Sequence, residues 1–448
     1  MTARQVGRDL CVRHGRVVTS SGVAEQEVLI LGGRVQQLGR RVQAPAGCPD
    51  LEARGMLVMP AGIDTQVHFR EPGLEHKEDL GSGSLAAVAG GIGAFCEMPN
   101  TQPPTADPDA LADKIRRAAG RSWADFAFFL GATADLADRL GDWESLPGCA
   151  GIKVFMGSST GNLLIPDDAT LERVMRSGTR RIAVHSEDEP RLRQRYAALD
   201  GRGEVSVAEH PDVRDVEVAV RATTRLLDLA EKTGRRVHLL HVSTAEEVAI
   251  LRERALGDLV TAEVTPNHLF LVAPDCYERF GTRAQMNPPV RDLRHRDALR
   301  QGLVDRVLSV VGSDHAPHSL EEKARPYPRS PSGIPGVQTT LPLLLTAVRD
   351  GWLRLEDIAQ VLSANPARTY GIERKGGLEP GDDGDLTVVD PSITEHLPLD
   401  RLRSRAGWSP FAGIELAGWP VVTVLRGMVV FRDGAPVGEP SGAPMTFA

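Results

Sequence analysis

Short apolar runs recur through the middle of the chain, and segments with helical periodicity separate most of them. Eight such runs stand at residues 57–63, 92–98, 125–130, 150–156, 181–185, 236–242, 259–264 and 307–312. Apolar residues recur at helical spacing in the intervening segments 111–119 and 219–230. This alternation predicts parallel strands, and eight of them predict a closed (β/α)8 TIM barrel in the α/β class. An open doubly wound sheet is the alternative, although no Gly-x-Gly-x-x-Gly sequence follows any run.

The two ends of the chain have a different pattern, in which turn residues interrupt short strand-like runs. These runs lie at residues 10–14, 15–19 and 28–35, and again at 385–390, 421–427 and 429–434. Because neither end has enough strands to bury a face alone, we expect the two ends to pair in one small β-sandwich. The predicted organisation is a β-sandwich formed by residues 1–56 and 375–448, with the barrel at 57–374 between them.

The composition is that of an ordinary globular protein. Of the 448 residues, 41% are hydrophobic and 25% are charged, which suits a large core. A formal net charge of -8 gives no broad support for binding nucleic acid. No uncharged apolar run is long enough to span a membrane, and the first residues contain no apolar signal segment, so we expect a cytoplasmic protein without a membrane partner. The five scattered cysteines favour reduced thiols over disulfides or a thiolate zinc site.

Polar side chains stand at or just after the ends of the predicted strands. They are His68, Asn100, Lys153, His185, His241, Asn267, His268, Asp314, His315 and His318. A barrel gathers the carboxyl ends of its strands at one mouth, where the active sites of such folds lie. Neutral imidazoles together with a carboxylate form a site for a divalent metal, with zinc the first choice and manganese, iron or cobalt after it.

The first barrel run ends in three polar residues two positions apart, Gln66, His68 and Arg70. If the chain stays extended there, all three side chains point the same way. They belong either to a binding site or to the water-facing side of an edge strand, and the three residues alone do not separate these alternatives.

Lys153 and Asp314 each allow two interpretations. Lys153 lies in an apolar strand, where it either reaches water or a carboxylate, or is neutral and reacts with carbon dioxide to form a carbamate that bridges two metals. Asp314 either caps a helix or binds a metal and takes a proton from the metal's water. Because Ala316-Pro317 does not begin an evident helix, the second interpretation of Asp314 is favoured.

The chain contains the short motifs Val67-His-Phe-Arg-Glu-Pro-Gly, Glu97-Met-Pro-Asn-Thr, Gly151-Ile-Lys-Val-Phe, Val184-His-Ser-Glu, His241-Val-Ser-Thr, Met286-Asn-Pro-Pro-Val and Gly312-Ser-Asp-His-Ala-Pro-His. In combination they resemble the amidohydrolase superfamily, and within it the cyclic-amide hydrolases, nearest to the dihydroorotases. The resemblance extends through Ser363-Ala-Asn-Pro-Ala-Arg to Gly384-Asp-Leu-Thr-Val-Val-Asp and so covers nearly the whole chain.

The resemblance implies a pair of divalent metals, most simply Zn²⁺. It makes His68 and Asp314 ligands of the more buried metal, His185 and His241 ligands of the second, and carboxylated Lys153 the bridge between them. In this arrangement water activated at the metals attacks a ring carbonyl, and Asp314 carries the proton to the leaving nitrogen.

The resemblance also implies a small-molecule substrate that carries a carboxylate. Arg70, Asn100 and His318 would hold that carboxylate, Asn287 would contact the ring, and the reaction would interconvert dihydroorotate and N-carbamoyl-L-aspartate in pyrimidine biosynthesis. A homo-oligomer and an association with aspartate carbamoyltransferase are the expected assemblies. Gln66 departs from the family, which has histidine at that position, and an amide is a weak zinc ligand. We therefore expect one or two ions, the more buried one being bound loosely or absent.

Two other functions stay open at this point. One is hydantoinase or allantoinase chemistry on the same scaffold, in which an uncharged ring would have no need of Arg70. The other is an inactive chain that supports aspartate carbamoyltransferase by binding it, an interpretation for which Gln66 is the only support.

Overall fold

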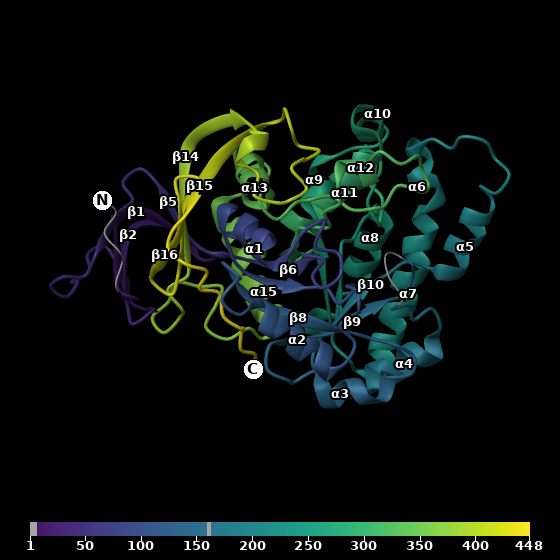
Figure 1. Ribbon diagram of the computed structural model, residues 1–448, viewed down its shortest axis with the longest axis horizontal. Helices are drawn as coiled ribbons and strands as arrows, with labels where there is room; N and C mark the ends of the chain where they lie inside the picture. Colours follow the sequence, from purple (N-terminus) through teal and green to yellow (C-terminus); the bar gives the residue numbers. More distant parts are fainter. Residues whose placement is uncertain (1–6, 159–162) are drawn as a thin grey trace.

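The computed structural model describes residues 7–158 and 163–448. Figure 1 shows two parts, a twisted sheet built from both ends of the chain and a strand barrel surrounded by helices. Residues 1–6, which contribute to the prediction that no signal segment is present, lie outside the described residues. Within the described residues, no helix combines the length and the apolar character needed to cross a membrane.

Eight parallel strands form the barrel, in the order in which they occur along the chain. They are β6 (Gly62–Val67), β7 (Ile92–Glu97), β8 (Asp125–Gly131), β9 (Cys149–Phe155), β10 (Ile182–His185), β11 (Val237–Leu239), β12 (Val260–Val264) and β13 (Val310–Val311). A parallel bridge between Val67 and His315 closes the ring, and His68 N donates to His315 O at 2.7 Å. The predicted barrel is confirmed.

The first predicted run divides between the two parts of the molecule. Strand β5 (Leu57–Pro60) pairs with β1 (Leu10–Thr19) and β14 (Leu386–His396) in the sheet of the chain ends, and only the following strand β6 enters the barrel. At Gly62 a Cβ would lie 2.4 Å from Ile92 Cδ1, so a larger residue would displace the Ile92 side chain where the chain passes from one sheet to the other. The expected single strand at 57–63 is therefore two strands.

The helices connect the barrel strands and cover the outside of the ring (Figure 1). Most begin at an aspartate or threonine whose side chain accepts a hydrogen bond from the first turn, as Asp215 does for α7. The helices are α1 (Leu80–Ala89), α2 (Pro108–Ala118), α3 (Leu140–Trp143), α4 (Asp168–Arg176), α5 (Glu189–Ala197), α6 (His210–Val213), α7 (Val216–Thr233), α8 (Ala245–Arg254), α9 (Pro266–Phe270), α10 (Asp275–Phe280), α11 (Leu293–Val304), α12 (Leu320–Lys323), α13 (Thr340–Arg349), α14 (Leu355–Ala359) and α15 (Asn365–Tyr370).

The two chain ends pair with each other, as predicted, in a sheet separate from the barrel. The strands are β1 (Leu10–Thr19), β2 (Gly22–Leu31), β3 (Arg34–Gly39), β4 (Asp50–Glu52), β5, β14 (Leu386–His396), β15 (Glu415–Leu425), β16 (Met428–Arg432) and β17 (Ala435–Pro436). The expected sandwich is one continuous nine-stranded sheet, in which β5 joins the strands of the two ends. Val12 and Val28 from one end share an apolar cluster with Leu386 and Val424 from the other.

Candidate active site

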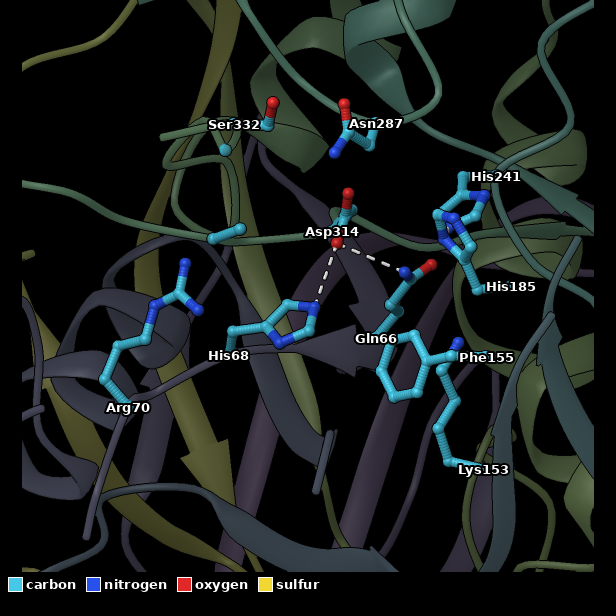
Figure 2. Close-up of a pocket in the computed structure, with 12 residues that line it drawn as sticks. Gln66, His68, Arg70, Lys153, Phe155, His185, His241, Asn287, Asp314 and Ser332 are labelled. Carbon is cyan, nitrogen blue, oxygen red and sulfur yellow. Dashed lines mark hydrogen bonds and ion pairs between the residues drawn. The ribbon is translucent and has the colours of Figure 1, made fainter. Parts of the chain in front are cut away.

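A pocket of about 370 Å³, counted with its open mouth, lies at the carboxyl ends of the barrel strands (Figure 2). Its lining residues are Gln66, His68, Arg70, Lys153, Phe155, His185, His241, Asn287, Asp314, Ala316, Ser332 and Gly333. The structure therefore brings together most of the site residues predicted from the sequence. Asn100 and His318 stand behind the lining, where each contacts a residue of the pocket wall.

Backbone geometry at the strand ends turns several of these side chains into the pocket. Arg70, His241 and Asp314 have φ angles of 68°, 36° and 47°, a left-handed conformation that side chains other than glycine rarely adopt. Such conformations persist where the surrounding structure enforces them, often at functional sites. Strand β6 ends at Val67, so Gln66, His68 and Arg70 are not on one extended strand, yet all three face the pocket.

One side of the pocket is built around Asp314. Its Oδ1 accepts a hydrogen bond from Gln66 Nε2 at 3.1 Å and lies 3.2 Å from His68 Nε2. Asn100 Oδ1 lies 2.7 Å from the other ring nitrogen of His68. Behind them, Asp64 accepts from the backbone N–H groups of Gln66 and Ser313, which fixes the two strand ends relative to each other.

The opposite side is built around two imidazoles that meet edge to face. His185 Nδ1 lies 2.9 Å from His241 Nε2, and burial lowers the pKa of both rings. His185 Nε2 donates to Glu187 at 2.8 Å, and the guanidinium of Arg214 pairs with the same carboxylate at 2.5 Å. Burial alone would raise the pKa of Glu187, but Arg214 and His185 hold it well below its usual value. His185 is therefore oriented from behind by a buried ion pair.

Lys153 extends from the middle of β9 towards the pocket, between these two sides (Figure 2). The residue is 1% exposed, and burial lowers the pKa of its amine to about 7. Its Nζ lies 4.4 Å from the centre of the Phe155 ring, and no carboxylate among the described residues forms an ion pair with it. A substantial fraction of the amine is therefore uncharged at neutral pH.

The donor set fits a divalent metal only if Lys153 takes part. Among the described residues no three His, Cys, Asp or Glu side chains converge as metal ligands would. Two pairs converge instead, His68 with Asp314 at 3.2 Å and His185 with His241 at 2.9 Å. Tetrahedral zinc ligands at about 2.0–2.1 Å from the ion are roughly 3.3 Å apart, close to both spacings.

The protonation of His68 gives a further test of that fit. Burial lowers its pKa although Asp314 raises it, so the ring is neutral and has one N–H. Both ring nitrogens nevertheless face oxygen atoms, those of Asn100 and Asp314. With the ring proton on Nδ1 towards Asn100 Oδ1, the lone pair of Nε2 faces Asp314 Oδ1, and a cation shared by these two atoms would suit the pair.

A cationic group lies at the other edge of the pocket. Arg70 is 3% exposed, and its guanidinium donates to Pro317 O at 3.2 Å and lies 3.2 Å from His318 Nε2. Burial lowers the pKa of Arg70 to about 10, which leaves it protonated. Among the described residues no carboxylate forms an ion pair with it. Because a buried charge without a counter-ion is costly, this guanidinium is suited to an anionic ligand.

Sequence reasoning also selected strand-end residues that the structure places elsewhere. His315 holds loops together, since its Nδ1 accepts from Gly336 N at 3.0 Å, and His268 lies 3.1 Å from Pro288 O. Conversely, Glu187 and Arg214 were not assigned a role. Glu187 had a local signal, because it stands two residues after His185 at a strand end, whereas Arg214 had none.

Known proteins resemble this chain over most of its length. A family model described as the amidohydrolase family matches residues 57–430. The dihydroorotase of Methanosarcina acetivorans is 37% identical over 96% of this chain and 94% of its own length. The dihydroorotase of Halobacterium salinarum is 36% identical over 92% of this chain and 97% of its own.

Among solved structures, the L-hydantoinase (dihydropyrimidinase) of Arthrobacter aurescens matches with a TM-score of 0.93. It is 29% identical, and the match covers 98% of this chain and 99% of that one. The sequence relatives and this structural neighbour thus carry different enzyme names on one architecture, so the substrate has to be argued from the pocket.

Proposed function

The chain belongs to the amidohydrolase family, and on that premise we propose that it is a dihydroorotase, a hydrolase of cyclic amides that interconverts dihydroorotate and N-carbamoyl-L-aspartate. The dihydroorotase relatives match almost the whole chain, barrel and terminal sheet included. The family implies a divalent metal.

The observation that carries the choice of substrate is the buried guanidinium of Arg70. Dihydroorotate has a carboxylate beside its ring, and a planar guanidinium binds a carboxylate through two parallel hydrogen bonds. His318 stands 3.2 Å from Arg70, and Asn100 stands behind His68 on the same side. An uncharged hydantoin would leave the Arg70 charge buried and unpaired.

We assign the metal ligands by the two converging pairs. His185 and His241 would hold one ion together with a carbamate on Lys153, and His68 with Asp314 would offer a second position. The ion, with zinc the first choice, supplies a Lewis acid that lowers the pKa of water and polarises the ring carbonyl. Glu187 fixes the tautomer of His185, so that Nδ1 presents its lone pair to the site.

The neutral amine of Lys153 supports the carbamate. An uncharged amine adds to carbon dioxide, its nitrogen forms a bond to the carbon, and one proton leaves to solvent. A pKa of about 7 provides that uncharged form, and the carbamate would then offer two oxygens that share one negative charge to the two histidine-containing pairs.

Asp314 is the residue that would move the proton. Its Oδ1 is held by Gln66, while Figure 2 shows the other carboxylate oxygen directed towards the side of the pocket where Asn287 lies. That second oxygen is suited to accept a proton from the attacking water and to deliver it to the ring nitrogen as the amide bond breaks. In the direction of ring closure the same oxygen takes the proton from the carbamoyl nitrogen.

Arg70→Met tests the assignment. Removing a buried charge-assisted pair costs about 2–5 kcal/mol, so kcat/KM for dihydroorotate should fall by roughly 30- to 4,000-fold, and hydrolysis of hydantoin should not fall with it. Arg181→Met is the matched control. Arg181, the residue before β10, is also buried, but it donates to the backbone oxygens of Thr369 and Val237 and to the Asp258 carboxylate. The control should leave the ratio of the two activities unchanged.

Two results would contradict the proposal. Hydrolysis of hydantoin but not of dihydroorotate, unaffected by Arg70→Met, would support the hydantoinase alternative. A metal-free, inert protein that copurifies with aspartate carbamoyltransferase would support the inactive-partner alternative. The expected homo-oligomer, the association with that transcarbamoylase and the cytoplasmic location stay predictions, and light scattering with and without the transcarbamoylase tests the first two.

A further inference from the structure

The carboxamide of Asn287 forms part of the pocket wall, and its two ends face different surroundings. Its Oδ1 lies 3.1 Å from His210 Nε2, away from the pocket. Figure 2 shows its nitrogen directed into the pocket, towards Asp314. Whichever end of the amide faces a bound ring decides whether the pocket offers a donor or an acceptor there.

His210 fixes which end that is, because its own protonation is determined by its neighbours. Its Nε2 faces two acceptors, Met286 O at 2.9 Å and Asn287 Oδ1 at 3.1 Å, so this nitrogen carries the proton. Its Nδ1 faces Tyr327 Oη at 3.3 Å and accepts from that hydroxyl. His210 is fully buried, and burial lowers its pKa to about 3, which keeps the ring neutral.

The hydrogen bonds continue behind His210 to the metal-binding side of the pocket. Tyr327 is hydrogen-bonded to Tyr196, and Tyr196 Oη accepts from Arg214 at 3.3 Å. Arg214 in turn pairs with Glu187, which orients His185. Helix α6 and the residue that follows it thus place His210 behind one wall of the pocket and Arg214 behind the other.

We propose that His210 is a positioning residue that orients Asn287, so that the carboxamide presents its N–H₂ group to the pocket and selects a ring with a carbonyl oxygen at that point. The proposal rests on the assignment of Asn287 to substrate binding in the proposed function. A ring that presents an N–H there would meet a donor and be rejected, because two donors cannot share a hydrogen bond. Dihydroorotate and hydantoin both carry ring carbonyls, so this selection is distinct from that of Arg70.

A double-mutant cycle with metal-loaded protein tests the inference. His210→Leu should lower kcat/KM about 10- to 100-fold, mainly through KM, because Asn287 loses its fixed orientation. In an Asn287→Ala background the same change should have less than about a threefold effect. Gln places a donor close to the position of His Nε2, so His210→Gln should restore activity to within about threefold of wild type.

The cycle separates this inference from the proposed function. It is run with dihydroorotate or hydantoin, whichever the wild type hydrolyses, and the wild type's preference tests the function alone. Equal effects of His210→Leu in both backgrounds would show a merely structural role and overturn the inference. A second measurement needs no activity. In the NMR spectrum of the ¹⁵N-labelled wild type, the imidazole signals that are missing in His210→Gln belong to His210, and they should show a protonated Nε2 and an unprotonated Nδ1. The opposite tautomer would also overturn it.

Discussion

The two sides of the pocket differ in how their polar groups are held. On one side, His185 is supported from behind by Glu187 and Arg214, a buried ion pair that leaves the lone pair of Nδ1 facing the site. On the other side, Gln66 and Asp314 are hydrogen-bonded to each other across the pocket wall, and Gln66 Oε1 is buried with no hydrogen-bond partner among the described residues. The first side is therefore preorganised, whereas on the second side two of the polar side chains are hydrogen-bonded to each other.

This difference indicates where a ligand must displace existing interactions. A metal at His185 and His241 displaces the contact between their two ring nitrogens, but it meets in His185 an imidazole that Glu187 already orients. A metal at His68 and Asp314 meets a carboxylate oxygen that already accepts a hydrogen bond from Gln66, and the Gln66 amide is itself only a weak metal ligand. We therefore expect tight binding on the first side and weak binding on the second.

Lys153→Met should have the largest effect, because Lys153 lies between the two sides and serves both. Without the carbamate each side keeps only two donors, so metal content should fall to near zero and turnover by at least about 10³-fold. The methionine side chain is apolar and replaces a buried amine, so the thermal stability of the metal-free protein should not fall. Metal analysis and thermal unfolding of the same samples measure both effects.

Lys323→Met is the matched control for that experiment. Lys323 is also buried, and its pKa is likewise lowered to about 7, but its Nζ donates to the backbone oxygens of Gln285, Pro331 and Gly333. Its loss should disturb the pocket wall near Ser332 and leave the metal content unchanged. Full metal content and activity in Lys153→Met would refute the carbamate.

Glu187→Gln should weaken the preorganised side without abolishing it. Removing the carboxylate behind a metal-binding histidine typically costs about 10- to 100-fold in metal affinity. Glu97→Gln controls for the loss of a buried carboxylate, since Glu97 pairs with Lys114 at 2.9 Å and does not line the pocket. Competition with a chelator gives the affinities, and equal values for the two variants would show that Glu187 does not support the metal.

The sequence alone predicted the barrel because buried parallel strands appear as continuous apolar runs, and all eight were found. It also predicted several of the residues that line the pocket from their position at strand ends, as for His68 and Asp314, whereas Lys153, expected at a strand end, lies within β9. The division of residues 57–63 between two sheets left no such signal, because both strands are apolar. Only Pro60 and Gly62 mark the passage from one sheet to the other.

The sequence did not predict the supporting residues Arg214 and His210, for a different reason. Arg214 pairs with a glutamate 27 positions earlier, and His210 bonds an asparagine 77 positions later. Both lie at or just after the short helix α6, in a connection whose sequence has no strand or helix pattern of its own that points to a site. Contacts of this kind depend on how loops pack over the barrel mouth, which a periodicity argument does not include.

Gln66→His should have the smallest effect on turnover, within about tenfold, but it should change the metal count. It removes the hydrogen bond to Asp314 Oδ1 and adds an imidazole next to His68, which gives the second side a full ligand set. We expect the wild type to retain one equivalent of zinc after dialysis and the variant to retain two. Gln66→Met also removes the hydrogen bond but adds no strong ligand, and should stay at one. Two equivalents in the wild type would show that the two sides bind metal equally well despite their different support.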